Sequence, residues 1–311
     1  MSLPLLQRVI HQSFAIALPM AMLATASMYA EDYSVVDQSG EHTDIVSPSG
    51  KTLLRYMYAR DTSSPERAFD TAKVFAHVMD ADGKNTITKG AGGKFPHHRG
   101  IFIGWNKLRH DGKSHDLWHV RNTEQKHREL LKQTSGPDGA SVTAVIDWIG
   151  NDGKPVVEEK RTYSVRQEDG THAIVDFKSE LTAIGGDVEL NGDPEHAGVQ
   201  FRPSQQVADN KSAKYIFHEA DIDPKKVQDL PWVAEDFQVD DQWWSVQHMS
   251  HPDNATGARW SAYRDYGRFG PFTVVTIPEG ETVTFQYRFR IQEGKSKPRA
   301  KLQQAYEEYI N

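Results

Sequence analysis

Short segments in which apolar and polar residues alternate are the dominant pattern of this chain. Across residues 282–291 every odd-numbered position is apolar, and every even-numbered position is Thr, Gln or Arg. Successive side chains of a strand point to opposite faces, so this period of two predicts a strand with one buried face. Similar patterns occur in residues 52–58, 74–79, 142–148, 156–165 and 173–184.

Turn residues separate these predicted strands at short intervals. Residues 151–153 (Asn-Asp-Gly) and 168–170 (Glu-Asp-Gly) have the composition of hairpin turns. Many strands joined in this way favour antiparallel packing over a fold with crossover helices. The main predicted helix covers residues 299–310, which follow Pro298 and place apolar residues near helical spacing. The fold class expected is therefore all-β, an antiparallel sandwich with short helices, one of them near the C-terminus.

The N-terminus has the features of a secretory signal peptide. Arg8 and His11 precede an apolar run over residues 14–26, and small residues follow. The run is shorter than the roughly 20 residues that a membrane-spanning helix needs. We therefore expect a signal peptide over residues 1–30 and a single β-sandwich domain over residues 31–311. The protein should be periplasmic or secreted, with no membrane contact after cleavage.

The amino-acid composition excludes several kinds of functional site and of binding partner. The chain has no cysteine, which excludes disulfides, thiolate metal sites and a cysteine nucleophile. Its formal net charge is −7, and removing Arg8 with the signal would make it −8. Because nucleic-acid binding usually needs a basic face, this balance predicts no nucleic-acid partner. Attraction for an anionic ligand must come from local groups such as Arg99, Arg202 and Arg264.

Residues 94–105 are the most informative segment for function, because two adjacent histidines and an arginine run into an apolar stretch. Interpreted as one strand, the segment places His98 on the same face as Gly100 and Gly104. Two glycines on one face indicate close approach by a ligand or by another backbone. The other face would carry Phe95, His97, Arg99, Ile101, Ile103 and Trp105. His98 would then face a binding site; a buried, hydrogen-bonded histidine pair at a sheet rim is the alternative.

Residues 195–202 repeat this arrangement. An apolar face of Ala197, Val199 and Phe201 is expected in the core, and the opposite face carries His196, Gly198, Gln200 and Arg202. Two strands with matching polar, glycine-gapped faces favour one shared concave site. We therefore expect His98 and His196 to face the same cavity, with Gln200 and Arg202 on its wall.

The chemistry of this site must come from histidines, carboxylates and arginines. Histidine titrates near pH 6.5, so His98 and His196 are expected to exchange protons with a substrate, with His119 as the third candidate. Arginines would neutralise the negative charge that develops during the reaction. The residues expected to contact substrate are His77, His97, Arg99, Trp105, Gln200, Arg202, Tyr263 and Arg264. Three imidazoles could instead bind zinc or another divalent metal, although the chain has no His-x-x-x-His pair in a predicted helix and no Glu-flanked zinc motif.

Aromatic residues near these segments indicate a class of ligand. Flat aromatic rings suit the apolar face of a sugar, while Arg, Gln and His bind its hydroxyls or carboxylates. Plain core packing is the alternative for these rings. They are Trp105, Trp118, Trp243, Trp244, Trp260, Tyr263 and Tyr266.

Two runs of residues resemble the DUF6807 family of exported bacterial proteins, over roughly residues 50 to 292. The first run includes His77, Gly83, Thr88-Lys89-Gly90, Pro96-His97-His98-Arg99-Gly100 and Gly104-Trp105, and the second His251-Pro252-Asp253-Asn254, Arg259-Trp260, Arg264 and Tyr266-Gly267. Members often carry a methane-oxygenase label, but that oxygenase subunit is helical and membrane-spanning, and the pattern of this chain predicts neither. The resemblance implies an antiparallel β-supersandwich related to galactose mutarotases and polysaccharide lyases. It also implies association with glycan-degrading systems.

Together these observations predict an exported carbohydrate-processing enzyme. We expect a lyase, dehydratase or epimerase that acts on acidic oligosaccharides or sugar acids by histidine acid–base catalysis. A non-catalytic glycan-binding protein and a metal-dependent glycan hydrolase are the alternatives. No cofactor is required by the acid–base mechanism, and whether a divalent metal is bound is left open. The oligomeric state is left open.

Overall fold

The structure is a computed structural model that describes residue 1 and residues 32–311. The predicted signal peptide therefore lies, apart from Met1, outside the described residues. Every strand pairing in the described chain is antiparallel, and three short helices accompany the sheets. The expectation of an all-β antiparallel fold is confirmed.

The larger sheet has eight strands and contains most of the alternating segments. In spatial order they are β14 (Lys214–Phe217), β15 (Trp232–Val239), β16 (Gln242–Ser250), β20 (Thr282–Glu293), β11 (Ala173–Ala183), β10 (Pro155–Arg166), β9 (Ala140–Ile149) and β8 (Glu124–Thr134). Phe285, Tyr287 and Phe289 of β20 are buried, as their period of two requires. The turns at residues 151–153 and 168–170 connect β9 to β10 and β10 to β11.

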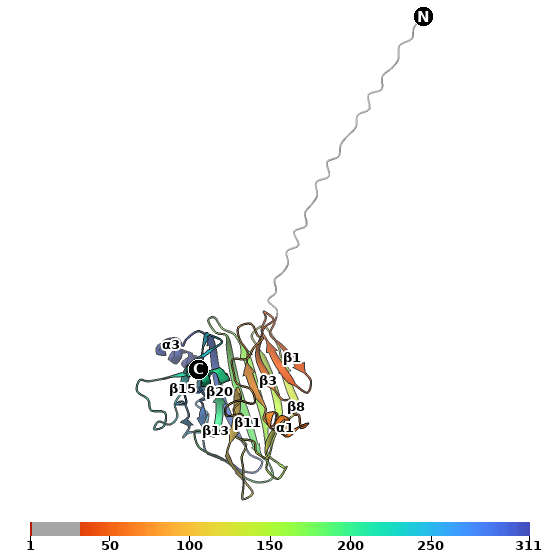
Figure 1. Cartoon of the computed structure of the whole chain (residues 1–311), viewed down its shortest axis with the longest axis vertical. Coiled ribbons are helices and arrows are strands. Elements are labelled where there is room, and N and C mark those ends of the chain that lie inside the picture. Colours follow the sequence, from red (N-terminus) through yellow and green to blue (C-terminus); the bar gives the residue numbers. More distant parts are fainter. Residues whose placement is uncertain (2–31) are drawn as a thin grey trace.

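A six-stranded sheet packs against the larger one. Its order is β1 (Ser34–Gln38), β2 (His42–Val46), β3 (Thr52–Met57), β4 (Phe75–Val78), β5 (Ile101–Trp105) and β13 (Ala197–Phe201). The Trp105 ring of β5 contacts Trp148 of β9 and Phe285 of β20, with ring centroids 6.0 and 5.6 Å apart. The inner faces of the two sheets thus share one core, which is the arrangement of a β-sandwich (Figure 1).

Smaller elements accompany the two large sheets. They are a four-stranded sheet of β19 (Val275–Ile277), β12 (Val188–Asn191), β6 (Lys107–His110) and β7 (Lys113–His115), the pair β17 (Arg259–Trp260) and β18 (Pro271–Phe272), and the helices α1 (Pro65–Asp70), α2 (Gln205–Asn210) and α3 (Arg299–Ile310). The helix predicted over residues 299–310 is confirmed as α3, which buries Leu302 against Trp232 and Met249. Figure 1 shows α3 on the side of β15 and α1 on the side of β8.

One buried ion pair lies inside the sandwich. Glu159 and Arg161 are two residues apart on β10, share one face and are both 0 % exposed. Arg161 donates two hydrogen bonds to Glu159, at 2.7 and 2.8 Å, and a third to the carbonyl of Val74. Trp148 Nε1 and Ser179 Oγ donate to the remaining lone pairs of the carboxylate, each at 2.7 Å. The guanidinium and the carboxylate of this pair therefore both have hydrogen-bond partners inside the protein.

The interpretation of residues 94–105 as one strand is wrong in its first half. Strand β5 begins at Ile101, and the preceding residues form a loop with a turn that His98 closes by donating its N–H to the Phe95 carbonyl. The period-two assignment of His97 and His98 to opposite faces therefore fails. The glycines make room for backbone rather than ligand, because a Cβ at Gly104 would lie 2.5 Å from the Leu117 carbonyl oxygen.

Candidate functional site

A pocket of about 310 Å³ collects four histidines from three separate segments. His97 and His98 come from the loop before β5, His119 follows β7, and His196 immediately precedes β13. Their rings form a row, with centroids 4.4 Å apart for His98–His97, 4.5 Å for His97–His119 and 5.2 Å for His119–His196. The structure therefore brings His98 and His196 to one cavity and adds His97 and His119 between them.

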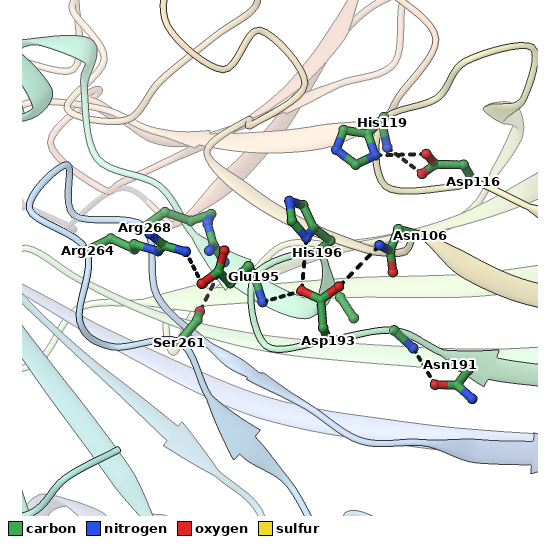
Figure 2. A network of polar contacts seen from close by, with 12 residues as sticks. Asn106, Asp116, His119, Asn191, Asp193, Glu195, His196, Ser261, Arg264 and Arg268 are labelled. Atoms are coloured by element: carbon green, nitrogen blue, oxygen red, sulfur yellow. Dashed lines mark hydrogen bonds and ion pairs between the residues drawn. The ribbon is translucent and has the colours of Figure 1, made fainter. Parts of the chain in front are cut away.

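Two histidines of the row are each held by an aspartate three residues earlier in the chain. His119 Nδ1 lies 2.8 Å from Asp116 Oδ2, and His196 Nδ1 lies 2.9 Å from Asp193 Oδ1 (Figure 2). A carboxylate accepts a hydrogen bond, so Nδ1 of each ring carries the proton and Nε2 is left as the basic nitrogen. Each pair has the composition of a general base with an orienting carboxylate.

The two aspartates are ionised despite their partial burial. Desolvation raises the pKa of Asp116 and of Asp193, but hydrogen bonds from their histidines and from backbone N–H groups outweigh it and lower both pKa values overall. Asp116 also accepts from the backbone N–H groups of Trp118 and His119, at 3.1 and 2.8 Å. Asp193 accepts from the N–H of Glu195 at 3.0 Å. Backbone N–H groups thus hold each carboxylate in place, and each carboxylate in turn orients an imidazole.

His97 and His98 are neutral imidazoles. Burial, reinforced by the charge of Lys73, lowers the pKa of His97 to about 2. Burial and the nearby charge of Arg268 lower the pKa of His98 well below its usual value. His98 Nδ1 has no hydrogen-bond partner among the described residues. A neutral imidazole that resists protonation still has one N–H, and it can donate this hydrogen bond to a developing oxyanion.

Buried arginines surround the floor of the pocket, and several of their nitrogens are unpaired. Arg268 is 0 % exposed, lies 5.4 Å from the Trp118 ring centroid and donates from Nη1 to Gln200 and Ser261. Arg202 is also 0 % exposed and donates from Nη1 to two backbone carbonyls. In the described part of the chain, Nε and Nη2 of both arginines have no hydrogen-bond partner.

The charge of Arg202 is poorly compensated within the protein. Burial raises the pKa of the neighbouring Glu235 well above its usual range, which weakens it as a counter-ion, and neither of its carboxyl oxygens has a hydrogen-bond partner among the described residues. Burial lowers the pKa of Arg202 to about 10, which still leaves the guanidinium charged. Because a buried charge without a counter-ion is costly, this region favours a bound anion.

The outer wall of the pocket combines an ion pair with two aromatic rings. Arg264 pairs with Glu195, which also accepts a hydrogen bond from the Tyr263 hydroxyl at 3.4 Å. Phe95 and Tyr266 line the other side, with ring centroids 4.8 Å apart. Phe95 has a φ of +57°, an uncommon conformation for a bulky residue and one that concentrates at functional sites. The wall therefore offers charged, hydrogen-bonding and flat apolar surfaces together.

The structure separates the predicted substrate-contacting residues into three groups. His97 and Arg264 line the pocket with the three predicted catalytic histidines, and Tyr263 contacts its Glu195–Arg264 pair. Gln200 and Arg202 are buried beneath the pocket rather than on its wall. The remaining three lie elsewhere: Trp105 donates to the Thr273 carbonyl in the core, His77 bonds with Thr88, and Arg99 is buried between Phe69 and Phe75.

Sequence reasoning missed several residues of the site, and one signal could have revealed two of them. Asp116 and Asp193 both stand in an Asp-x-x-His arrangement, as Asp-Leu-Trp-His and Asp-Pro-Glu-His. Comparing the surroundings of the candidate histidines would have shown this repeat. Arg268 carried no such signal, because its burial beneath the pocket depends on contacts between distant segments.

The His-Pro-x-Asn segment has a structural role instead. Asn254 Oδ1 accepts from the N–H of Gln286 at 2.8 Å, and its Nδ2 donates to the Gln286 carbonyl at 2.7 Å. His251 Nδ1 accepts from the N–H of Asp253. These bonds fix the loop after β16 to the edge of β20, away from the four histidines.

The described residues contain neither a metal-binding cluster nor a membrane-spanning helix. In Met1 and residues 32–311, no group of three His, Asp or Glu side chains is arranged to hold a metal ion. No helix within the same part of the chain is long and apolar enough to cross a membrane.

Comparisons with known proteins give one clear match. The sequence model of a family of unknown function, DUF6807, matches residues 45–307. No curated protein matches the chain. Among solved structures, the heparan sulfate lyase HepC mutant from Pedobacter heparinus is similar at 10 % identity and a TM-score of 0.39, covering 86 % of this chain and 36 % of the lyase. A GalM/aldose epimerase homologue from C. elegans is similar at 8 % identity and a TM-score of 0.33, covering 85 % of this chain and 99 % of the homologue. This chain therefore spans about a third of the lyase, and likeness at this level carries no argument about activity.

Proposed function

The chain belongs to the DUF6807 family, and from the chemistry of its own pocket we propose that it is an exported carbohydrate lyase that acts on acidic oligosaccharides. The observation that carries the proposal is the pair of Asp-held histidines, His119 and His196, beside a floor of buried arginines. The first feature suits proton transfer, and the second suits an anionic substrate. Export rests on the signal-peptide pattern of residues 1–30.

The reaction proposed is a β-elimination next to a sugar carboxylate. His196 Nε2 takes the proton from the carbon that bears the carboxylate, and the C–H electron pair moves into the carboxylate to give an enolate-like dianion. That pair then forms a carbon–carbon double bond while the C–O bond at the next carbon breaks. His119, in the turnovers in which its Nε2 carries a proton, donates that proton to the departing oxygen. The net change is cleavage into an unsaturated and a saturated sugar, with no water consumed.

The groups beneath the pocket stabilise the charge that develops. The unpaired nitrogens of Arg202 and Arg268 place positive charge beside the dianion, in a region from which water is excluded. His97 and His98 stay neutral and donate hydrogen bonds without competing for the proton. Electrostatic stabilisation of this kind is commonly the largest contribution to an enzyme's rate.

The row of histidines favours elimination over epimerisation. Inverting a carbon by two-base catalysis needs a base on each face of the sugar, each within about 3–3.5 Å of the reacting atom. Here all four imidazoles are neighbours in one row, with centroid separations of 4.4 to 5.2 Å. Elimination can use neighbouring groups, because one removes the proton and the next protonates the leaving oxygen.

One observation keeps the hydrolase as a second candidate. Metal-bound histidines commonly donate their second N–H to a carboxylate, as His119 and His196 do here. A metal hydrolase would consume one water for each bond cleaved and would lose activity on chelation. These two properties distinguish it from the lyase.

The test is a screen of the purified protein against acidic oligosaccharides, followed by ultraviolet absorbance of the unsaturated product. Replacing His196 or His119 by Ala should lower turnover by about 10²-fold or more, the usual scale for a general acid or base. The matched control is His110→Ala, since His110 lies outside the pocket and bonds the carbonyl of Ile184. Unchanged turnover in the double variant His119→Ala/His196→Ala would refute the mechanism, as would loss of activity on chelation with recovery on adding zinc.

A further inference from the structure

A second cavity lies beside the histidine pocket. It has a volume of about 650 Å³ and is formed by α1, residues 120–123 with the first residue of β8, Glu124, and the turn between β9 and β10. Pro65, Ala68 and the half-buried Phe69 give it an apolar wall, and Asn122 and Glu124 give it polar groups. Its volume is within the range of pockets that hold small organic ligands.

One residue belongs to both cavities. Arg121 lines the histidine pocket and the second cavity, and it stands two residues after His119. Its side chain is exposed, and none of the hydrogen bonds or ion pairs found in residues 32–311 involves it. A guanidinium in this position can bind a carboxylate at the junction of the two cavities.

The backbone on both sides of Arg121 has an unusual conformation. Val120 has a φ of +52° and Asn122 a φ of +59°. Asparagine tolerates the left-handed region, but a β-branched residue in it is a genuine outlier. Val120 is 4 % exposed, so packing holds the strained loop in place. This conformation sets Arg121 between the cavities.

We propose that the second cavity binds the sugar units that extend from the ring held at the histidines, with Arg121 binding a carboxylate of the chain where the cavities meet. This inference rests on the proposed lyase function and adds the place where the substrate continues. A sugar ring has an apolar C–H face and a rim of hydroxyls. The apolar wall at Phe69 and the polar groups of Asn122 and Glu124 complement those two surfaces.

The experiment compares short and long substrates with a variant that fills the second cavity. Ala68→Trp places a large side chain there and leaves the four histidines untouched. Galacturonic acid oligomers and glucuronate-containing oligomers would be used as disaccharides, tetrasaccharides and hexasaccharides. We expect kcat/KM of the wild type to rise about 10-fold or more from the disaccharide to the tetrasaccharide. Ala68→Trp should lose that rise and keep the wild-type value for the disaccharide. The matched control is Ala305→Trp, the same change on a helix that lines a remote surface cavity.

Binding measured without turnover separates this inference from the proposed function. Calorimetry with the His196→Ala protein should show affinity that increases with oligomer length, and a loss of about 10-fold for the hexasaccharide when Ala68→Trp is added. Equal affinity at all lengths, no binding of any oligomer, or an unchanged hexasaccharide affinity in the Ala68→Trp protein would overturn the second cavity as a sugar site. Turnover of the disaccharide alone, equal in wild type and Ala68→Trp, would leave the lyase intact and refute only this inference. Length-dependent binding without any turnover would support the second cavity as a sugar site and contradict the lyase mechanism.

Discussion

Two buried groups of charges in this protein differ in how completely the protein satisfies them. Arg161 on β10 is paired with Glu159 through two hydrogen bonds and donates a third to the Val74 carbonyl. Arg202 and Arg268, beneath the histidine pocket, are equally buried, but each leaves Nε and Nη2 without a partner among the residues described. We call Glu159 and Arg161 the closed group, because their charged atoms have partners inside the protein. Arg202 and Arg268 are the open group, because their unpaired nitrogens remain able to interact with a bound anion.

The difference separates a structural role from a functional one. An isolated buried charge is expensive, so a fold that retains two of them beside a pocket has a cost that a bound anion can offset. Glu159 does this for Arg161 from within the protein. Glu235 does it less completely for Arg202, because burial raises the pKa of Glu235 and its carboxyl oxygens make no hydrogen bond to Arg202. We infer that the substrate supplies the missing negative charge.

The largest effect is expected where the closed group is broken. Glu159→Gln would leave Arg161 charged and without its counter-ion inside the core, which costs about 3–5 kcal/mol of unfolding free energy. Chemical denaturation followed by circular dichroism would measure it. A loss below about 1 kcal/mol would show that the Glu159–Arg161 pair is not the closed structural unit described.

The open group should respond in the opposite way. Arg268→Met removes an uncompensated buried charge, so stability should change by less than about 1 kcal/mol or increase. Turnover should fall by about 10²–10³-fold, the scale for removing one group that stabilises an oxyanion. Denaturation and steady-state kinetics on the same preparation would check both values. Strong destabilisation with unchanged kcat would assign Arg268 to the fold instead.

Smaller losses are expected when the histidines lose their orienting carboxylates. Asp116→Asn and Asp193→Asn keep the side-chain shape but remove the charge that holds each Nδ1–H, and turnover should fall by about 10–100-fold, as for other orienting partners. The Asp152→Asn variant is the control, because Asp152 pairs with Lys113 outside the pocket. Equal effects in Asp193→Asn and Asp152→Asn would contradict the assignment.

The smallest effect concerns mild acid. Burial lowers the pKa of His77 to about 4, so the unfolded chain, with a histidine pKa near 6.5, binds the proton more readily than the folded one. The contribution of His77 to stability is therefore complete above about pH 6.5 and is lost as the pH falls toward 4, by up to about 1.4 kcal/mol over the unit between about pH 6.5 and 5.5. Thermal unfolding of His77→Gln should show a shallower fall than wild type between pH 7 and 5.5. Parallel curves would contradict the assignment of this dependence to His77.

The sequence predicted the sandwich well because alternation is a local property. The odd-numbered apolar residues of 282–291 and the C-terminal helix appear where expected. The convergence of His98 and His196 was also predicted, but the strand argument for it failed, since His98 lies in a loop closed by a turn at Phe95. Arg268 and Arg121 could not be found, because their positions depend on how distant loops pack. Trp105 was placed at the site although its ring belongs to the core.

The mass balance of the reaction tests the central claim most directly. An acidic oligosaccharide would be incubated with the purified protein and with its His196→Ala variant, and all products identified by mass spectrometry. The account predicts fragments whose masses sum to the mass of the substrate, one of them unsaturated, and about 10²-fold less of both with the variant. Fragments that sum to the substrate plus one water would show hydrolysis and contradict the elimination proposed for His119 and His196.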